Sequence, residues 1–151
     1  MKSKPKIVTI GGAMRDIFLV TDSAKIAENN GDLECKKIIG FELGAKTNIK
    51  KILNTIGGAA CNVAIGLKKM GVEPFPFVEI GDDSIGAAIK RELKEMKIST
   101  RLMQKDKFKQ TGFSFIIVDS KTREHVAFCN KEASEDIKIS IKKILAVKPD
   151  W

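Results

Sequence analysis

The chain has 151 residues, of which 27 are lysine or arginine and 19 are aspartate or glutamate, giving a formal net charge of +8. Its apolar fraction of 43% is that of an ordinary globular protein, and its length suits one domain with a hydrophobic core. No apolar run approaches membrane-spanning length, and no signal-peptide core follows the basic N-terminus. We therefore expect a cytoplasmic protein with no membrane partner.

The excess of positive charge does not by itself indicate nucleic-acid binding. Lysine pairs are spread along the chain without interleaved aromatic residues or a known reading motif. They are expected on solvated faces, so we predict no specific nucleic-acid partner.

The three cysteines, Cys35, Cys61 and Cys129, lack metal-ligand spacing and are interpreted as buried free thiols of a reducing compartment. No metal site is predicted.

The first predicted element is a strand at residues 7–10, which leads into Gly11 and Gly12 and then to Asp16. An ionised aspartate at such a place can accept hydrogen bonds from two adjacent hydroxyl groups, and its charge strengthens both bonds. Asp16 is therefore the first candidate for contact with a polyol. The residues alone also permit a surface aspartate in a loop.

Residues 17–56 mix polar, glycine-containing turns with short apolar runs. Three strands are predicted here, at residues 17–20, 38–43 and 49–56, with a turn cluster at residues 28–32. Such a segment can cover a ligand, or it can be a β-hairpin without a functional role.

Residues 57–81 are the most informative segment. Gly57 and Gly58 reach positive φ at low cost, so they predict a sharp turn that a ligand can approach closely. Asn62 falls in the first turn of the helix predicted next, where a side-chain amide and free backbone N–H groups suit a hydroxyl-bearing ligand. Gly71 is predicted to end this helix, before a strand at residues 72–80. The predicted buried face of the helix is Ala60, Val63, Ala64, Leu67 and Met70.

A second helix is predicted at residues 84–96, preceded by Asp82 and Asp83. We interpret these two residues as structural, because capping and the helix dipole favour acidic residues at a helix start. A metal or acid/base pair is the less favoured alternative. Two strands follow at residues 111–118 and 124–129, and the polar linker between them suits a hairpin.

These positions resemble the N-terminal signature of the ribokinase-like, or PfkB, family of carbohydrate and nucleoside kinases. Asp16 is similar to the family's sugar-binding aspartate, and the resemblance covers nearly the whole chain. Seven further positions fall at the family's spacing without a gap: Gly57, Gly58, Ala60, Asn62, Ala64, Gly71 and Gly81. The resemblance implies an α/β, Rossmann-like fold with a mostly parallel sheet flanked by helices. A small β-sheet lid would be formed by about residues 17–56 and 108–130.

The resemblance further implies that residues 1–151 are the N-terminal part of an ATP-dependent sugar or nucleoside kinase domain. The acceptor would be bound by Asp16, Gly57, Gly58 and Asn62. The family's Thr-x-Gly-Ala-Gly-Asp motif, which holds the catalytic base, is not found, so the C-terminal half of the fold is expected to be missing and the catalytic residues to lie beyond Trp151. ATP and Mg²⁺ would serve the complete enzyme, with neither bound by this chain alone, which is expected to be inactive.

Two segments depart from the family pattern. Met14 stands where ribokinase-type members often place a polar residue that touches the sugar, which makes ribose a less expected substrate. Residues 130–134 replace an Arg-Gly-Ala-Asn-like sequence and are left out of the predicted site. Residues 148–151 fall where a further strand of the central sheet is expected to begin.

A second interpretation is a non-catalytic module that binds a polyol or dimerises through its lid. An incomplete sheet leaves an open edge, which a partner normally covers. The expected partners are therefore a small carbohydrate or nucleoside, together with either the missing C-terminal half or a second copy of the chain.

Overall fold

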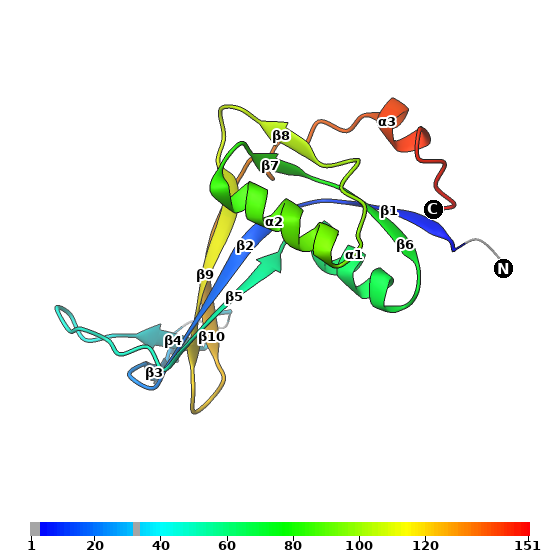
Figure 1. Cartoon of the computed structure of the whole chain (residues 1–151). Coiled ribbons are helices and arrows are strands. Elements are labelled where there is room, and N and C mark those ends of the chain that lie inside the picture. Colours follow the sequence, from blue (N-terminus) through cyan, green and yellow to red (C-terminus); the bar gives the residue numbers. More distant parts are fainter. Residues whose placement is uncertain (1–3, 32–33) are drawn as a thin grey trace. The chain divides into compact units, whose positions relative to one another are not determined.

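The computed structural model describes residues 4–31 and 34–151 and divides into two compact units. The first unit comprises the chain up to Arg15 together with Thr55–Phe113 and Cys129–Trp151. The second comprises Asp16–Asn54 and Ser114–Phe128. Figure 1 shows the elements along the chain.

The first unit contains two short parallel sheets. Strand β1 (Lys6–Ile10) pairs with β6 (Glu73–Phe77), and β7 (Glu79–Gly81) pairs with β8 (Gln104–Asp106). Parallel pairing needs crossover connections, which usually contain a helix. Helix α1 (Ala59–Lys69) precedes β6 and contacts it, and α2 (Ser84–Glu95) connects β7 to β8.

Two clusters of buried side chains form the core of the first unit. One includes Phe75 and Phe77 of β6, with Leu102 and with Val147, which follows the short helix α3 (Ile141–Leu145). The other gathers α1, α2 and the strands beside them: Ala13, Ile56, Ala60, Cys61, Ala64, Val78, Ile80, Ile89, Leu93 and Ile98. Helices therefore bury their apolar faces against the strands, as the predicted α/β class requires.

The last residues of the chain lie along β1. The Trp151 N–H donates to the Lys6 carbonyl at 3.2 Å, and the Val8 N–H donates to the Trp151 carbonyl at 2.8 Å. This alternation of donor and acceptor is that of a parallel ladder. Trp151 thus bonds to β1 at the place where the sequence predicts a further strand of the central sheet to begin, but residues 148–151 are not assigned to a strand.

The second unit is built of strands. The four strands of its main sheet lie in the order β10-β9-β2-β5, and β3 (Lys25–Glu28) pairs antiparallel with β4 (Lys37–Gly40). The main-sheet strands are β2 (Met14–Thr21), β5 (Lys51–Gly57), β9 (Thr111–Asp119) and β10 (His125–Glu132). Strands are found where they were predicted at residues 17–20, 49–56, 111–118 and 124–129, whereas the strand predicted at 38–43 ends at Gly40. Neither β3 nor β8 was predicted, and the run predicted at 72–80 is broken at Val78. Of the predicted turn cluster, Asp32 lies outside the described residues.

The buried face predicted for α1 is partly wrong. Val63 and Met70 are 53% and 79% exposed, while Cys61 is buried. The buried arc is made of the small residues Ala60, Cys61 and Ala64, which let the helix lie close to the strands and leave the longer side chains outside. The predicted helix end at Gly71 is confirmed, because its φ is 85° and its N–H donates to the Lys68 carbonyl.

The interpretation of the cysteines as buried is correct only for Cys61. Cys35 and Cys129 are exposed. Burial raises the pKa of the Cys61 thiol to about 12, so the thiolate needed for nucleophilic chemistry is disfavoured. Among the described residues, no helix is long and apolar enough to cross a bilayer.

Candidate functional site

The diglycine turn joins β5 to α1 in the first unit. Gly57 ends β5. A positive φ was predicted for both glycines, but of the two only Gly58 has one, at 90°. A Cβ added to Gly58 would lie 2.3 Å from the Gly12 carbonyl oxygen and 2.8 Å from the Ala13 nitrogen. Glycine at this position therefore allows two backbone segments to cross in near contact.

The N-terminus of α1 is open. Gly58 is the N-cap and has no side chain to accept from the first-turn N–H groups, whereas α2 and α3 are capped by Asp83 and Ser140. The Asn62 N–H makes the first bond of the helix, to the Gly58 carbonyl at 2.9 Å. The Asn62 side chain is exposed. Within the described residues, no side chain thus caps the first N–H groups of α1, and they lie beside an amide that can both donate and accept.

A serine that the sequence analysis left out fixes the loop beside this turn. The Ser134 hydroxyl accepts from the Ala13 N–H at 3.1 Å and lies 2.9 Å from the Ala13 carbonyl. The Thr9 hydroxyl donates to the Ala60 carbonyl at 3.0 Å, which ties the end of β1 to α1. The segment from Gly11 to Ala13 is thereby held against the diglycine turn.

Asp16 lies in β2 and belongs to the second unit. The Ser114 hydroxyl of β9 donates to Asp16 Oδ1 at 2.5 Å. Ser114 is buried, and Asp16 is half-buried. No pattern in the sequence distinguishes Ser114, because a serine within an apolar strand resembles any other inward-facing small residue.

Arg15, which precedes Asp16 in the chain, is anchored in the first unit. Its two terminal nitrogens donate to the two carboxylate oxygens of Glu92 in α2, at 2.7 and 3.1 Å. The hydrogen bonding from Arg15 holds the pKa of Glu92 below its usual range, against the opposing effect of burial. A bidentate pair of this kind fixes the start of β2 on α2.

Asp83 has a structural role, as predicted. It caps α2 through the Gly86 N–H at 2.7 Å, and it accepts from both the N–H and the hydroxyl of Thr111 at 2.7 and 2.8 Å. The Thr111 hydroxyl in turn accepts from the Gly81 N–H at 2.9 Å. Asp82, its neighbour, forms an exposed ion pair with Lys105. Gly81, Asp83 and Thr111 therefore form a junction between β7, α2 and β9.

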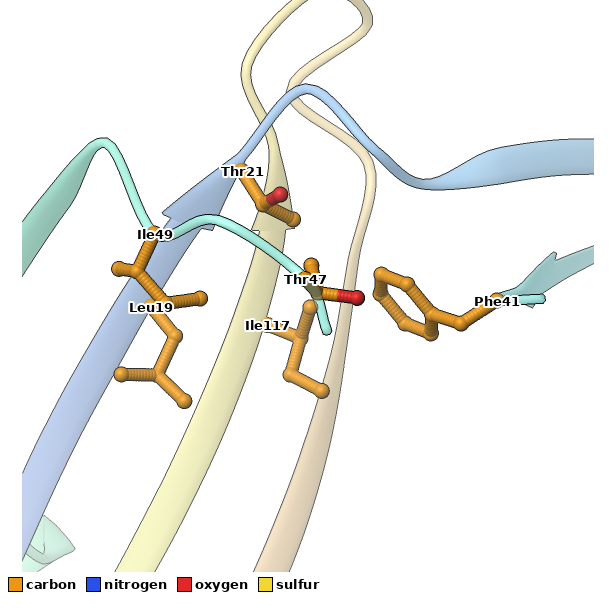
Figure 2. Close-up of a pocket in the computed structure, with 6 residues that line it drawn as sticks. All are labelled: Leu19, Thr21, Phe41, Thr47, Ile49 and Ile117. Carbon is orange, nitrogen blue, oxygen red and sulfur yellow. The ribbon is translucent and has the colours of Figure 1, made fainter. Parts of the chain in front are cut away.

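The second unit also contains an apolar pocket of about 160 Å³, shown in Figure 2. Its lining is Leu19, Thr21, Phe41, Thr47, Ile49 and Ile117. Side chains alternate between the two faces of a strand, so Leu19 and Ile117 lie on the sheet face opposite to Asp16 and Ser114. One face of this sheet thus carries the polar pair and the other carries the pocket.

Of the predicted site residues, the structure brings Gly57, Gly58 and Asn62 together at the start of α1. Asp16 lies in the other unit, so its place in the same acceptor site stays a prediction. Ser114, Ser134 and Arg15 are the neighbours that sequence reasoning missed.

Comparison with known proteins agrees with the motif. A family model described as "pfkB family carbohydrate kinase" matches residues 4–147. An uncharacterized sugar kinase from Pyrococcus horikoshii is 32% identical over 79 residues, which cover 52% of this chain and 26% of that protein. The chain therefore spans about a quarter of the length of this relative.

Two solved structures show the fold. A nucleoside kinase of the ribokinase family from Methanocaldococcus jannaschii has a TM-score of 0.63 and 24% identity over 85% of this chain and 38% of its own. A ribokinase from Cryptococcus neoformans, solved in complex with ADP, has a TM-score of 0.63 and 19% identity over 87% of this chain and 36% of its own. The predicted ribokinase-like α/β fold is confirmed, and this chain spans less than two fifths of each of these two structures.

Proposed function

Because this chain belongs to the pfkB family of carbohydrate kinases, we propose that it is the N-terminal, acceptor-binding portion of an ATP-dependent kinase of sugars or nucleosides. The family match over residues 4–147 and the partial coverage of both solved kinases support this proposal. In the complete enzyme an acceptor hydroxyl would attack the γ-phosphate of ATP. The base that takes the hydroxyl proton would come from outside residues 1–151.

The proposed acceptor site combines a carboxylate, a side-chain amide and an open helix start. Asp16 would accept from acceptor hydroxyls, and Asn62 would both donate and accept. Gly57 and Gly58 would let the acceptor approach the backbone closely. The observation that carries the proposal is the uncapped start of α1, where backbone donors lie beside the exposed Asn62 amide.

The second unit would serve as the lid of this site. Phosphoryl transfer to an alcohol competes with transfer to water, so covering the acceptor protects the nucleotide and strengthens electrostatic contacts. The segments proposed for the lid are about residues 17–56 and 108–130. Covering the site in this way is a separate role from binding the acceptor. In the complete enzyme, the lid would lower the rate at which ATP is hydrolysed by water.

ATP would supply the phosphoryl group, and Mg²⁺ would neutralise charge on its phosphate oxygens. Within residues 4–31 and 34–151, no three histidine, cysteine, aspartate or glutamate side chains are grouped to hold a metal ion. No residue of this chain is therefore assigned to the metal.

Replacing Asp16 by asparagine is expected to weaken acceptor binding by roughly tenfold to a hundredfold, because the replacement removes a charged acceptor of hydrogen bonds. Isothermal titration with ribose, fructose and inosine would measure this. Asp22→Asn is the matched control, since Asp22 is a carboxylate of the same unit that pairs with Lys50 on the surface. Equal affinities for the wild type and Asp16→Asn would contradict the proposed role of Asp16.

The apolar pocket favours a second candidate function, self-association through the second unit. Ile49 in its lining is 39% exposed, and burying this side chain against a second copy of the chain would gain apolar contact. We expect light scattering to find a dimer that Ile49→Lys dissociates. Val63→Lys, which places the same charge on an exposed position of α1, is expected to leave the dimer intact. A monomeric wild type at micromolar concentration would rule this candidate out.

A further inference from the structure

We infer that Ser114 is a positioning residue for acceptor binding, because its hydroxyl holds the Asp16 carboxylate in one orientation. One carboxylate oxygen is then engaged by the protein, and the other is left for an acceptor hydroxyl. The inference rests on the proposed function, in which Asp16 contacts the acceptor.

The contact joins two neighbouring strands of one sheet. Asp16 lies in β2 and Ser114 lies in β9, and these strands are adjacent in the order β10-β9-β2-β5. Their residues are 98 positions apart in the chain, yet Ser114 Oγ lies 2.5 Å from Asp16 Oδ1. A hydroxyl that donates to a carboxylate at this distance makes a charge-assisted bond, which is stronger than one between neutral groups.

Burial separates the roles of the two residues. Ser114 is 2% exposed, so an acceptor molecule has little access to its hydroxyl, and its single proton is directed to Asp16. Asp16 is half-buried and is the member of the pair that solvent can reach. Ser114 therefore acts on an acceptor through Asp16.

Orientation matters because a carboxylate rotates easily about its last torsion, which has a broad and nearly two-fold profile. A free carboxylate would have to be ordered when the acceptor binds, and that ordering lowers affinity. The buried hydroxyl of Ser114 fixes the carboxylate in advance. Removing it is expected to weaken acceptor binding by about tenfold, in keeping with the loss of one hydrogen bond to a charged group.

The chain provides a matched control in Thr21. This residue is also a buried hydroxyl in the second unit, but it donates to the Asn48 carbonyl at 2.9 Å and has no contact with Asp16 among the described residues. Thr21→Val deletes a hydroxyl with comparable burial. A loss caused only by disturbing the sheet should therefore appear in both variants.

The test is a titration of the full chain with ribose, fructose and inosine, using wild type, Ser114→Ala, Ser114→Thr, Asp16→Asn and the double variant of Ser114→Ala with Asp16→Asn. We expect Ser114→Ala to bind about tenfold more weakly and Ser114→Thr, which keeps the hydroxyl, to recover most of the affinity. In the Asp16→Asn background, Ser114→Ala should have little further effect, because the serine acts through that carboxylate. Should Ser114→Ala not fold, Ser114→Cys takes its place, since a thiol is similar in size and a weak donor.

The outcomes separate the inference from the proposed function. If wild type binds none of the three probes, the proposed function fails and the inference fails with it. If wild type binds and Ser114→Ala binds equally well, only the inference is overturned. It is also overturned if Thr21→Val weakens binding as much, or if the effects of the Ser114 and Asp16 substitutions simply add.

Discussion

Replacing Gly58 by alanine is expected to lower the free energy of unfolding by at least about 3 kcal/mol, from the strain of a positive φ and from overpacking. The φ of Gly58 is 90°, and the new Cβ would lie 2.3 Å from the Gly12 carbonyl oxygen and 2.5 Å from its carbonyl carbon. These neighbours are backbone atoms that a rotamer change cannot move aside. The turn would have to shift, and the start of α1 would shift with it. Urea unfolding followed by circular dichroism would measure the effect.

Gly66→Ala is the matched control for this change. Gly66 lies within α1, is exposed, and would place its Cβ where no atom lies within 4 Å. Alanine in an open helical position is expected to raise stability by about 0.5–1 kcal/mol. If Gly58→Ala were as stable as Gly66→Ala, the close crossing of the Gly12 and Gly58 segments would be wrong.

Replacing Asp83 by alanine is expected to lower the free energy of unfolding by about 3 kcal/mol, because it removes a helix cap and leaves buried donors unpaired. Asp83 accepts from the Gly86 N–H and from two groups of Thr111, whose side chain is fully buried. Asp82→Ala is the control, because the Asp82 side chain forms an exposed ion pair with Lys105 and its loss should change stability by less than about 1 kcal/mol. Equal losses in the two variants would contradict the junction described for Asp83.

The same junction makes a prediction about pH. Burial opposes the charge on Asp83, but hydrogen bonds from Gly86, Thr111 and Ile85 outweigh it and hold the pKa of the carboxyl below its usual value of 3.8. A lowered pKa in the folded state gives stability that is present above the unfolded value and is lost as the pH falls through the folded value. Asp83→Asn is therefore expected to have a lower free energy of unfolding than wild type at pH 5. This difference should shrink as the pH falls from 5 toward the lowest pH at which the protein folds. A deficit that stays constant over this range would contradict the lowered pKa.

Much of the fold could be predicted because its elements are marked locally. The apolar spacing of Ile85, Ile89 and Leu93 marks α2, and Asp83 marks its start. Gly71, in the left-handed region, marks the end of α1. Each of these signals depends on backbone geometry within a few residues, so the local sequence is enough to predict the element.

The parts that were missed or wrong depend on contacts between distant residues. The rotation of α1 toward Cys61 follows from which strands the helix packs against, and not from its own apolar spacing. Arg15 and Glu92 are 77 residues apart, and Ser134 and Ala13 are 121 apart. No periodicity or spacing connects such pairs. The residues that hold Asp16 and the glycine loop in place therefore became visible only in the structure.

Asp16 and Asn62 are proposed to bind one and the same acceptor molecule. Nuclear magnetic resonance can test it by following the Asp16 carboxylate carbon, the Asn62 side-chain amide and the Gly58 N–H while ribose, fructose or inosine is added. We expect one of these probes to shift all three signals with a single dissociation constant. Shifts confined to Asp16 or to Asn62 alone, or no shifts with any probe, would contradict the account.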